Sequence, residues 1–256
     1  MRQDERAPFV EALQRARVSA YPPGEFADQE SFMRASEIRA LAVAAGIRPG
    51  TEVLDLCCGV AGPGRLITRE LGCRYLGVDY SPSALEIARE RSVGLDCRFE
   101  IALIPPVPDG SFDVVLLLET MLAFPDKDEL LRHVAAVLPL GGRFAFTLEE
   151  GVALTEAERD AMPDADTVWL TPLPEIVTLL GSVGLQVRSQ VECSDTHLAM
   201  VDALIASFEA ESATISAQVG DRALDELVAA HRLWSDWLRT GRVRKFALVA
   251  VKVTTR

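Results

Sequence analysis

Two acidic residues and three glycines between positions 55 and 79 have the spacing of a nucleoside-binding site. Asp55 lies within a short apolar run, and Asp79 directly follows the next one, residues 75–78. The segment that follows the first run has glycines at positions 59, 62 and 64. A glycine-rich turn between a strand and a helix lets the backbone approach a ligand closely, and an acid after the next strand can bind both hydroxyl groups of a ribose. Because Asp55 precedes the glycines, the pattern favours a ligand with a cationic end over a pyrophosphate.

Further segments follow in a fixed order and complete a set of motifs. They read VLDLCCGVAG at 53–62, GVDYS at 77–81, PDGSFD at 108–113 and LPLGGR at 138–143. Together these residues resemble the motifs of class I methyltransferases that use S-adenosylmethionine, especially those that act on small molecules. The resemblance covers roughly residues 50 to 150. It departs from the family pattern at Cys57, which replaces the first glycine of the loop, and at Ile101, which stands where the family has an adenine-binding acid.

The resemblance implies S-adenosylmethionine as the cofactor and assigns residues to its parts. Asp55 is expected to pair with the amino group of the cofactor, and Asp79 is expected to bind the ribose. Backbone amides of the glycine loop suit the carboxylate, because the following helix presents its positive end there. The adenine is expected to lie against Tyr80. It is expected to be held by backbone groups of Ile101 and Ala102 and by apolar contact, and the alternative is that Glu100 binds its exocyclic amine. The full set of other expected cofactor contacts in the core is Cys57, Gly59, Gly62, Tyr80, Ile101, Ala102 and Leu118.

Four more side chains are candidates for the cofactor site or the reaction. Tyr21 and Gln29 lie in an N-terminal segment that resembles the lid of the family, with the tyrosine over the sulfonium and the glutamine near the methionine end. Glu119 follows the fourth predicted strand at its carboxyl end, where ligands collect in open α/β sheets. His197 lies at the start of a predicted helix, whose positive end disfavours the protonated imidazole. Glu119 and His197 are therefore the candidate catalytic residues, although a base is needed only if the attacking atom loses a proton.

Composition excludes several kinds of partner. The net charge of −12 argues against a nucleic-acid partner, because phosphate binding requires a basic face. The five cysteines include no Cys-x-x-Cys and no Cys/His pair at zinc spacing, so no metal is expected. An odd number of cysteines without a signal sequence favours a reducing cytoplasm. No apolar run approaches the ~20 residues that a membrane span needs.

Strands and helices alternate along most of the chain, which predicts a Rossmann-like α/β fold. Strands are expected at about 52–56, 75–78, 97–101, 112–118, 142–149, 184–192 and 244–253. Helices are expected between them at about 63–71, 82–92, 126–138 and 171–183. Alternation at these lengths predicts a seven-stranded, mostly parallel sheet with helices on both faces.

The remaining segments are expected to form a helical cover within a single domain, residues 1–256. Residues 1–50 form an N-terminal helical lid with a helix at about 29–45, and residues 51–150 form the cofactor-binding core. Residues 151–256 form the C-terminal half, in which a helical roof of two amphipathic helices is inserted at about 195–240.

These features predict the transfer of a methyl group from S-adenosylmethionine to a small molecule bound between lid and roof. The alternative is a protein that binds S-adenosylmethionine but catalyses a non-methylating reaction such as a cyclisation, or that only binds a metabolite. A dinucleotide-dependent oxidoreductase is disfavoured, because the glycines miss the G-x-G-x-x-G spacing and Asp55 would repel a pyrophosphate. The sequence identifies neither the acceptor, nor the atom that is methylated, nor the oligomeric state.

Overall fold

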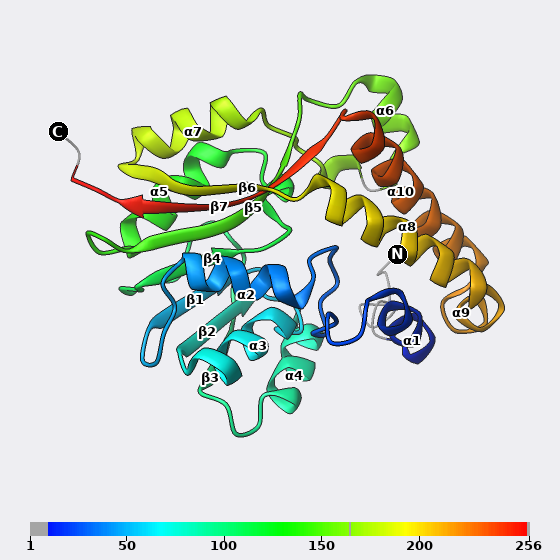
Figure 1. Ribbon diagram of the computed structural model, residues 1–256, viewed down its shortest axis with the longest axis horizontal. Helices are drawn as coiled ribbons and strands as arrows, with labels where there is room; N and C mark the ends of the chain where they lie inside the picture. Colours follow the sequence, from blue (N-terminus) through cyan, green and yellow to red (C-terminus); the bar gives the residue numbers. More distant parts are fainter. Residues whose placement is uncertain (1–9, 164, 255–256) are drawn as a thin grey trace.

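The computed structural model describes residues 10–163 and 165–254, and its centre is a seven-stranded sheet in the order β3-β2-β1-β4-β5-β7-β6 (Figure 1). The strands are β1 Glu52–Leu56, β2 Arg74–Asp79, β3 Cys97–Ile101, β4 Val114–Leu117, β5 Arg143–Glu150, β6 Leu185–Glu192 and β7 Arg244–Lys252. The first five strands pair in parallel, whereas β7 runs antiparallel to both β5 and β6. The predicted Rossmann-like, mostly parallel sheet is confirmed.

Helices cover both faces of this sheet. On one face lie α2 Ala35–Ala44, α3 Gly62–Leu71 and α4 Pro82–Arg91, and on the other lie α5 Lys127–Val137 and α7 Leu173–Ser182. The short β4 is buried along its whole length between these layers. A strand covered on both sides reads as an unbroken apolar run, which explains the Val-Val-Leu-Leu sequence of β4.

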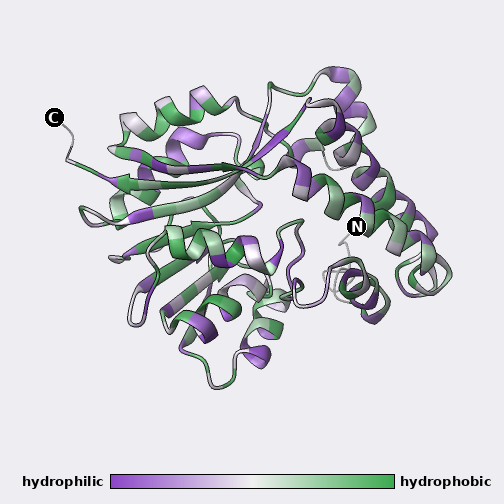
Figure 2. Cartoon of the chain, in the orientation of Figure 1, coloured by the Kyte–Doolittle hydropathy of each residue, from purple (hydrophilic) through white to green (hydrophobic). Residues whose placement is uncertain are grey.

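A further layer of helices stands beyond the carboxyl ends of the parallel strands (Figure 1). It comprises α1 Glu11–Ala20 and the three helices that we call the roof helices, α8 Ser194–Ala210, α9 Ser212–Val219 and α10 Asp221–Thr240. The sequence predicts two helices here, but the structure has three. Gly220, with a φ of +89° that an L-residue rarely adopts, separates α9 from α10. The long helices α8 and α10 carry hydrophobic and hydrophilic residues on different sides (Figure 2), and their apolar residues pack on α1.

The segment before α2 differs from the sequence expectation. The helix expected at about 29–45 begins only at Ala35, and residues 21–34 form what we call the lid loop. Two consecutive prolines at 22 and 23 and the left-handed Asp28, with a φ of +57°, keep this segment out of a helix. Glu37 then caps α2 by accepting the amide of Arg34 at 2.8 Å. The loop crosses the carboxyl ends of the strands instead of lying along the sheet.

The described part of the chain also contains a short helix, α6 Glu156–Ala161, between β5 and α7. None of the helices described combines the length and the apolar character that crossing a bilayer requires.

Candidate active site

The turn between β1 and α3 holds three residues in the left-handed conformation: Cys57 (φ +58°), Gly59 (+54°) and Ala61 (+57°). For residues other than glycine this conformation costs about 1–2 kcal/mol, so the turn is held by its surroundings. Asp79, at the end of β2, is one of the groups that hold it. Its Oδ2 accepts the amide of Gly59 at 2.8 Å, and its Oδ1 accepts the amide of Ser81 at 2.9 Å. The structure therefore brings the glycine loop and the expected ribose-binding acid into direct contact.

Asp55 lies beneath this loop. Its side chain is buried, and its Oδ2 accepts the hydroxyl of Tyr75 from the neighbouring strand at 2.6 Å. Burial, with a smaller contribution from the charge of Asp79, raises the pKa of Asp55 from 3.8 to about 7, against the opposing effect of the Tyr75 hydrogen bond. Asp55 is thus an anchor of the loop in this structure, and its pairing with an amino group of a ligand stays a prediction.

The residues expected around the adenine lie at the outer end of β2 and β3. The side chains of Tyr80 and Ile101 are exposed, at 71% and 60%. The amide of Ala102 donates to the carbonyl of Asp79 at 3.0 Å, so this donor is already used within the protein. Leu118, at the end of β4, is half-buried against the core. The surface at this end is open and apolar, which fits a flat ring held by packing rather than by an acid.

The lid loop is fastened to the glycine loop. A side chain at Gly62 would stand 2.1 Å from the carbonyl oxygen of Ala27, so only glycine allows the lid loop to approach this closely. The buried Arg65 of α3 forms an ion pair with Asp28 of the lid loop at 2.6 Å. The N-terminal turn of α3 is therefore covered by residues 27 and 28.

Tyr21 and Gln29 are both buried and bind within the lid loop itself. The Tyr21 hydroxyl donates to the carbonyl of Ser31, and the Gln29 amide donates to the carbonyl of Met33 at 2.7 Å. Both side chains line the cavity described next. They shape its wall, and their contact with a cofactor stays a prediction.

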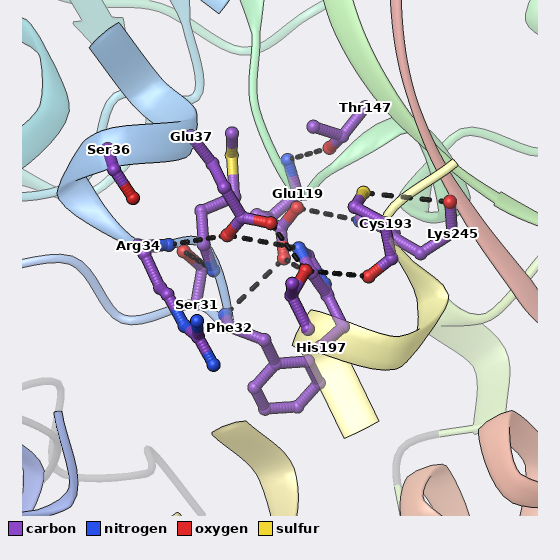
Figure 3. A network of polar contacts seen from close by, with 12 residues as sticks. Ser31, Phe32, Arg34, Ser36, Glu37, Glu119, Thr147, Cys193, His197 and Lys245 are labelled. Atoms are coloured by element: carbon purple, nitrogen blue, oxygen red, sulfur yellow. Dashed lines mark hydrogen bonds and ion pairs between the residues drawn. The ribbon is translucent and has the colours of Figure 1, made fainter. Parts of the chain in front are cut away.

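A cavity of about 290 Å³ lies between the lid loop, the roof helices and the carboxyl edge of the sheet. The apolar part of its wall comes mainly from α8 and α10. Its polar end is formed by four residues that we call the buried charge cluster, namely Glu119, Glu149, His197 and Lys245. Figure 3 shows Glu119, His197 and Lys245 converging from β4, α8 and β7. Residues far apart in the sequence thus meet at one end of the cavity.

Glu119 is held at this end by its backbone as well as by its charge. Its φ of +61° is left-handed, and its amide donates to the hydroxyl of Thr147 at 2.6 Å. Its Oε1 lies 2.7 Å from Nζ of the buried Lys245, which also pairs with Glu149. The two carboxylates raise the pKa of Lys245, against the opposing effect of burial, so the lysine keeps its charge. A strained acid that is fixed by a buried cation is typical of a functional site.

The basic stretch at 239–245 suggests a solvated turn from the sequence alone, whereas the structure buries Lys245 in the site. The signal for its burial was present, because the lysine begins a buried apolar run in the last strand, where a charge must have a partner. What the sequence does not contain is the identity of those partners, which come from the ends of β4 and β5.

His197 lies in the first turn of α8, on the cavity wall. In the described part of the chain neither of its ring nitrogens has a hydrogen-bond partner, and both are buried. Nδ1 lies 4.0 Å from Oε2 of Glu119, and Nε2 lies 3.9 Å from Oε2 of Glu37. Burial and the charge of Lys245 lower the pKa of His197 to about 3, so its imidazole is neutral near pH 7. The two candidate catalytic residues are thus neighbours in space.

Glu37, Cys193 and His197 place one potential metal ligand each within 4.8 Å of the others. This grouping was not visible in the spacing of the sequence. A metal would need the thiolate form of Cys193. Burial raises the pKa of that thiol to about 12, and its Sγ donates to the carbonyl of Lys245 at 3.5 Å, so the group is poorly suited to a metal.

Comparison with known proteins bears on the same residues. A family model described as "Methyltransferase domain" matches residues 53–142, from β1 to the turn before β5. The methyltransferase GfsG of Streptomyces halstedii is 38% identical over 105 residues, which are 39% of this chain and 38% of that protein. The 27-O-demethylrifamycin SV methyltransferase of Amycolatopsis mediterranei is 30% identical over 159 residues, 58% of either chain. The chain thus covers less than two thirds of these relatives.

Among solved structures, the cyclase SpnF superposes with a TM-score of 0.74 at 16% identity, over 99% of this chain and 96% of that one. At this identity the likeness concerns the fold alone. The superposition includes the lid loop and the roof helices, which lie outside the residues that the family model matches.

Proposed function

We propose that this chain is a class I methyltransferase, which transfers the methyl group of S-adenosylmethionine to a small molecule bound in the cavity. The match of residues 53–142 to a methyltransferase-domain model supports this proposal. The acceptor lies, in this proposal, between the lid loop and the roof helices. The observation that carries the proposal is the position of Glu119. It ends β4, next to the strand that leads into the glycine loop, and it also lines the cavity.

The cofactor site is proposed to lie along the ends of β1, β2 and β4. The glycine loop offers its backbone around Cys57 and Gly59 to the methionine part, and Asp79 offers its carboxylate to the ribose. Each oxygen of Asp79 already accepts one amide and keeps a free lone pair for a hydroxyl group. The open apolar surface at Tyr80 and Ile101 suits the adenine.

When bound, S-adenosylmethionine supplies a methyl group activated by a sulfonium, which requires an aligned attacking atom and little water. The apolar side chains of α8 and α10 offer water few hydrogen-bond partners on their side of the cavity. His197 is neutral near pH 7, so a ring nitrogen can accept a hydrogen bond from a hydroxyl group of the acceptor, although its lowered pKa of about 3 makes it a weak base in the unliganded site. Glu119, whose Oε2 lies 4.0 Å from Nδ1 of His197, places a carboxylate beside the positive charge that forms on the ring when it takes up a proton.

Calorimetry with Asp79→Ala tests the cofactor site. Loss of charge-assisted hydrogen bonds to the ribose, worth about 1.5–3 kcal/mol each, weakens S-adenosylmethionine binding by about 100-fold or more. Asp96→Ala, which removes an exposed aspartate before β3, is the matched control and retains wild-type affinity. Unchanged affinity in a correctly folded Asp79→Ala variant would contradict the assignment of β2.

Release of S-adenosylhomocysteine from a panel of small molecules tests the reaction itself. Wild-type protein is expected to release it with at least one acceptor, and Glu119→Gln and His197→Gln are expected to slow this release without abolishing cofactor binding. The fold is similar to that of the cyclase SpnF over nearly the whole chain, so the second candidate function is a cyclisation in which the cofactor is bound but not consumed. Conversion of a substrate without S-adenosylhomocysteine would favour that second function.

A further inference from the structure

The charged side chains on the wall of the cavity are paired with one another. Lys245 is bound by Glu119 and Glu149, and Arg17 of α1 forms an ion pair with Glu30 of the lid loop at 2.9 Å. Each cation on the described wall is therefore already compensated by an acid. An acceptor with a phosphate or a carboxylate group would enter beside these acids without a cation to neutralise it, which is costly in a buried site.

A second histidine, His231 of α10, lines the same cavity. Its Nδ1 lies 2.8 Å from the carbonyl oxygen of Leu227, one turn earlier in the helix. A carbonyl oxygen only accepts, so Nδ1 must carry the proton and Nε2 must be the acceptor. Within residues 10–163 and 165–254, no group donates a hydrogen bond to this Nε2. The tautomer of His231 therefore leaves Nε2 as an acceptor without a partner among the described residues.

The surroundings of His231 are aromatic. Phe32 and Phe208 meet its ring edge to face, with centroids 5.6 Å and 5.3 Å away. Burial lowers the pKa of His231 to about 4, so the ring accepts rather than donates at Nε2 near pH 7. Much of the remaining wall is formed by Leu204, Leu227, Trp234 and Leu238. The charge of Arg17 also reaches His231, but this cation is paired with Glu30. The aromatic and aliphatic side chains around His231 therefore leave Nε2 as the acceptor that a hydrogen-bond donor can reach amid mostly apolar contact.

We infer that the acceptor is an uncharged, largely apolar molecule with an alcohol or phenol group, and that a hydroxyl of this molecule donates a hydrogen bond to Nε2 of His231. The inference rests on the proposed function and narrows it to one chemical class. A hydroxyl group supplies the missing donor without adding a charge, and the aromatic and aliphatic wall buries the rest of the molecule. His231 is thus a residue that determines specificity, separate from the buried charge cluster.

Binding of three matched probes tests this inference in protein saturated with S-adenosylhomocysteine. The probes are β-naphthol, its methyl ether and its phosphate monoester, and binding is measured by calorimetry. β-Naphthol is expected to bind at least tenfold more tightly than the phosphate ester. His231→Phe is expected to weaken β-naphthol about tenfold, the effect of one hydrogen bond, and to leave the methyl ether within twofold.

Two further variants serve as controls for His231→Phe. His231→Gln keeps an acceptor oxygen on the side chain and is expected to retain most of the affinity for β-naphthol. His133→Phe makes the same substitution on α5, outside the cavity, and is expected to change nothing. Tighter binding of the phosphate ester, equal losses for naphthol and ether in His231→Phe, or no binding of β-naphthol at all would each overturn the inference.

A turnover experiment separates this inference from the proposed function. Phosphate esters and amines are compared with neutral alcohols and phenols as acceptors for S-adenosylhomocysteine release. Release with charged acceptors alone overturns the substrate class and leaves methyl transfer standing. Binding of β-naphthol that depends on His231, without release from any acceptor, supports the hydroxyl site and counts against methyl transfer.

Discussion

Replacing Asp55 with asparagine removes one titrating group and keeps its hydrogen bond. The side chain of Asp55 is only 3% exposed, and its Oδ2 accepts the Tyr75 hydroxyl at 2.6 Å. The amide oxygen of asparagine can accept the same hydroxyl but carries no charge at any pH. The substitution therefore isolates the loss of unfolding free energy that ionisation of this buried carboxyl group causes.

The size of that cost follows from the pKa of Asp55, which burial raises from 3.8 to about 7 in the folded state. Because the folded pKa lies above the unfolded one, the stabilisation is present at low pH and is lost as the pH rises through this window. At about 1.4 kcal/mol per pH unit, the whole window amounts to about 4 kcal/mol. Integration between pH 5 and pH 8 assigns about 2.5 kcal/mol of lost unfolding free energy to Asp55 alone.

Urea unfolding at pH 5 and pH 8, followed by tryptophan fluorescence, measures this difference. Wild-type protein contains other titrating groups, but they are shared with Asp55→Asn, so the comparison cancels them. The variant is expected to lose about 2.5 kcal/mol less than the wild type between the two pH values. Asp96→Asn, at an exposed position, is expected to follow the wild type. If Asp55→Asn lost as much stability as the wild type, the carboxyl group would be ionised at pH 5 and the reasoning would be refuted.

Two further substitutions test the lid loop and the buried charge cluster. In Gly62→Ala the new methyl group would stand 2.1 Å from the carbonyl oxygen of Ala27, so the lid loop has to lift. We expect faster proteolysis within residues 21–34 and at least tenfold weaker cofactor binding, and an unchanged cleavage rate would contradict the close approach. Lys245→Met leaves Glu119 and Glu149 buried without their cation, which is expected to lower the unfolding free energy at pH 7 by about 3–5 kcal/mol. Adding Glu149→Gln is expected to recover part of this loss in urea unfolding, and no recovery would argue against the pair.

Local patterns carried most of the information about the sheet. The apolar runs and the glycine turn predicted β1, α3 and β2, because strand and helix periodicity are properties of neighbouring residues. The contact between Gly59 and Asp79 was also within reach of the sequence, since the carboxyl ends of adjacent parallel strands meet at one edge. The lid loop was harder to predict. Residues 29–34 can continue the helical pattern of the following segment or cross the ends of the strands, and local sequence does not decide between the two.

The sequence by itself determined the sheet, the glycine loop and the two acids beside it, and the matching family model covers the same residues. Only the tertiary structure decided what surrounds the cavity. Lys245 contacts Glu119 because β7 pairs antiparallel with β5. His231 lines the cavity because the packing of α10 against α8 fixes the rotation of α10 about its own axis. Such contacts join segments far apart in the chain, and the packing of whole elements, which no local pattern encodes, sets the direction of their side chains.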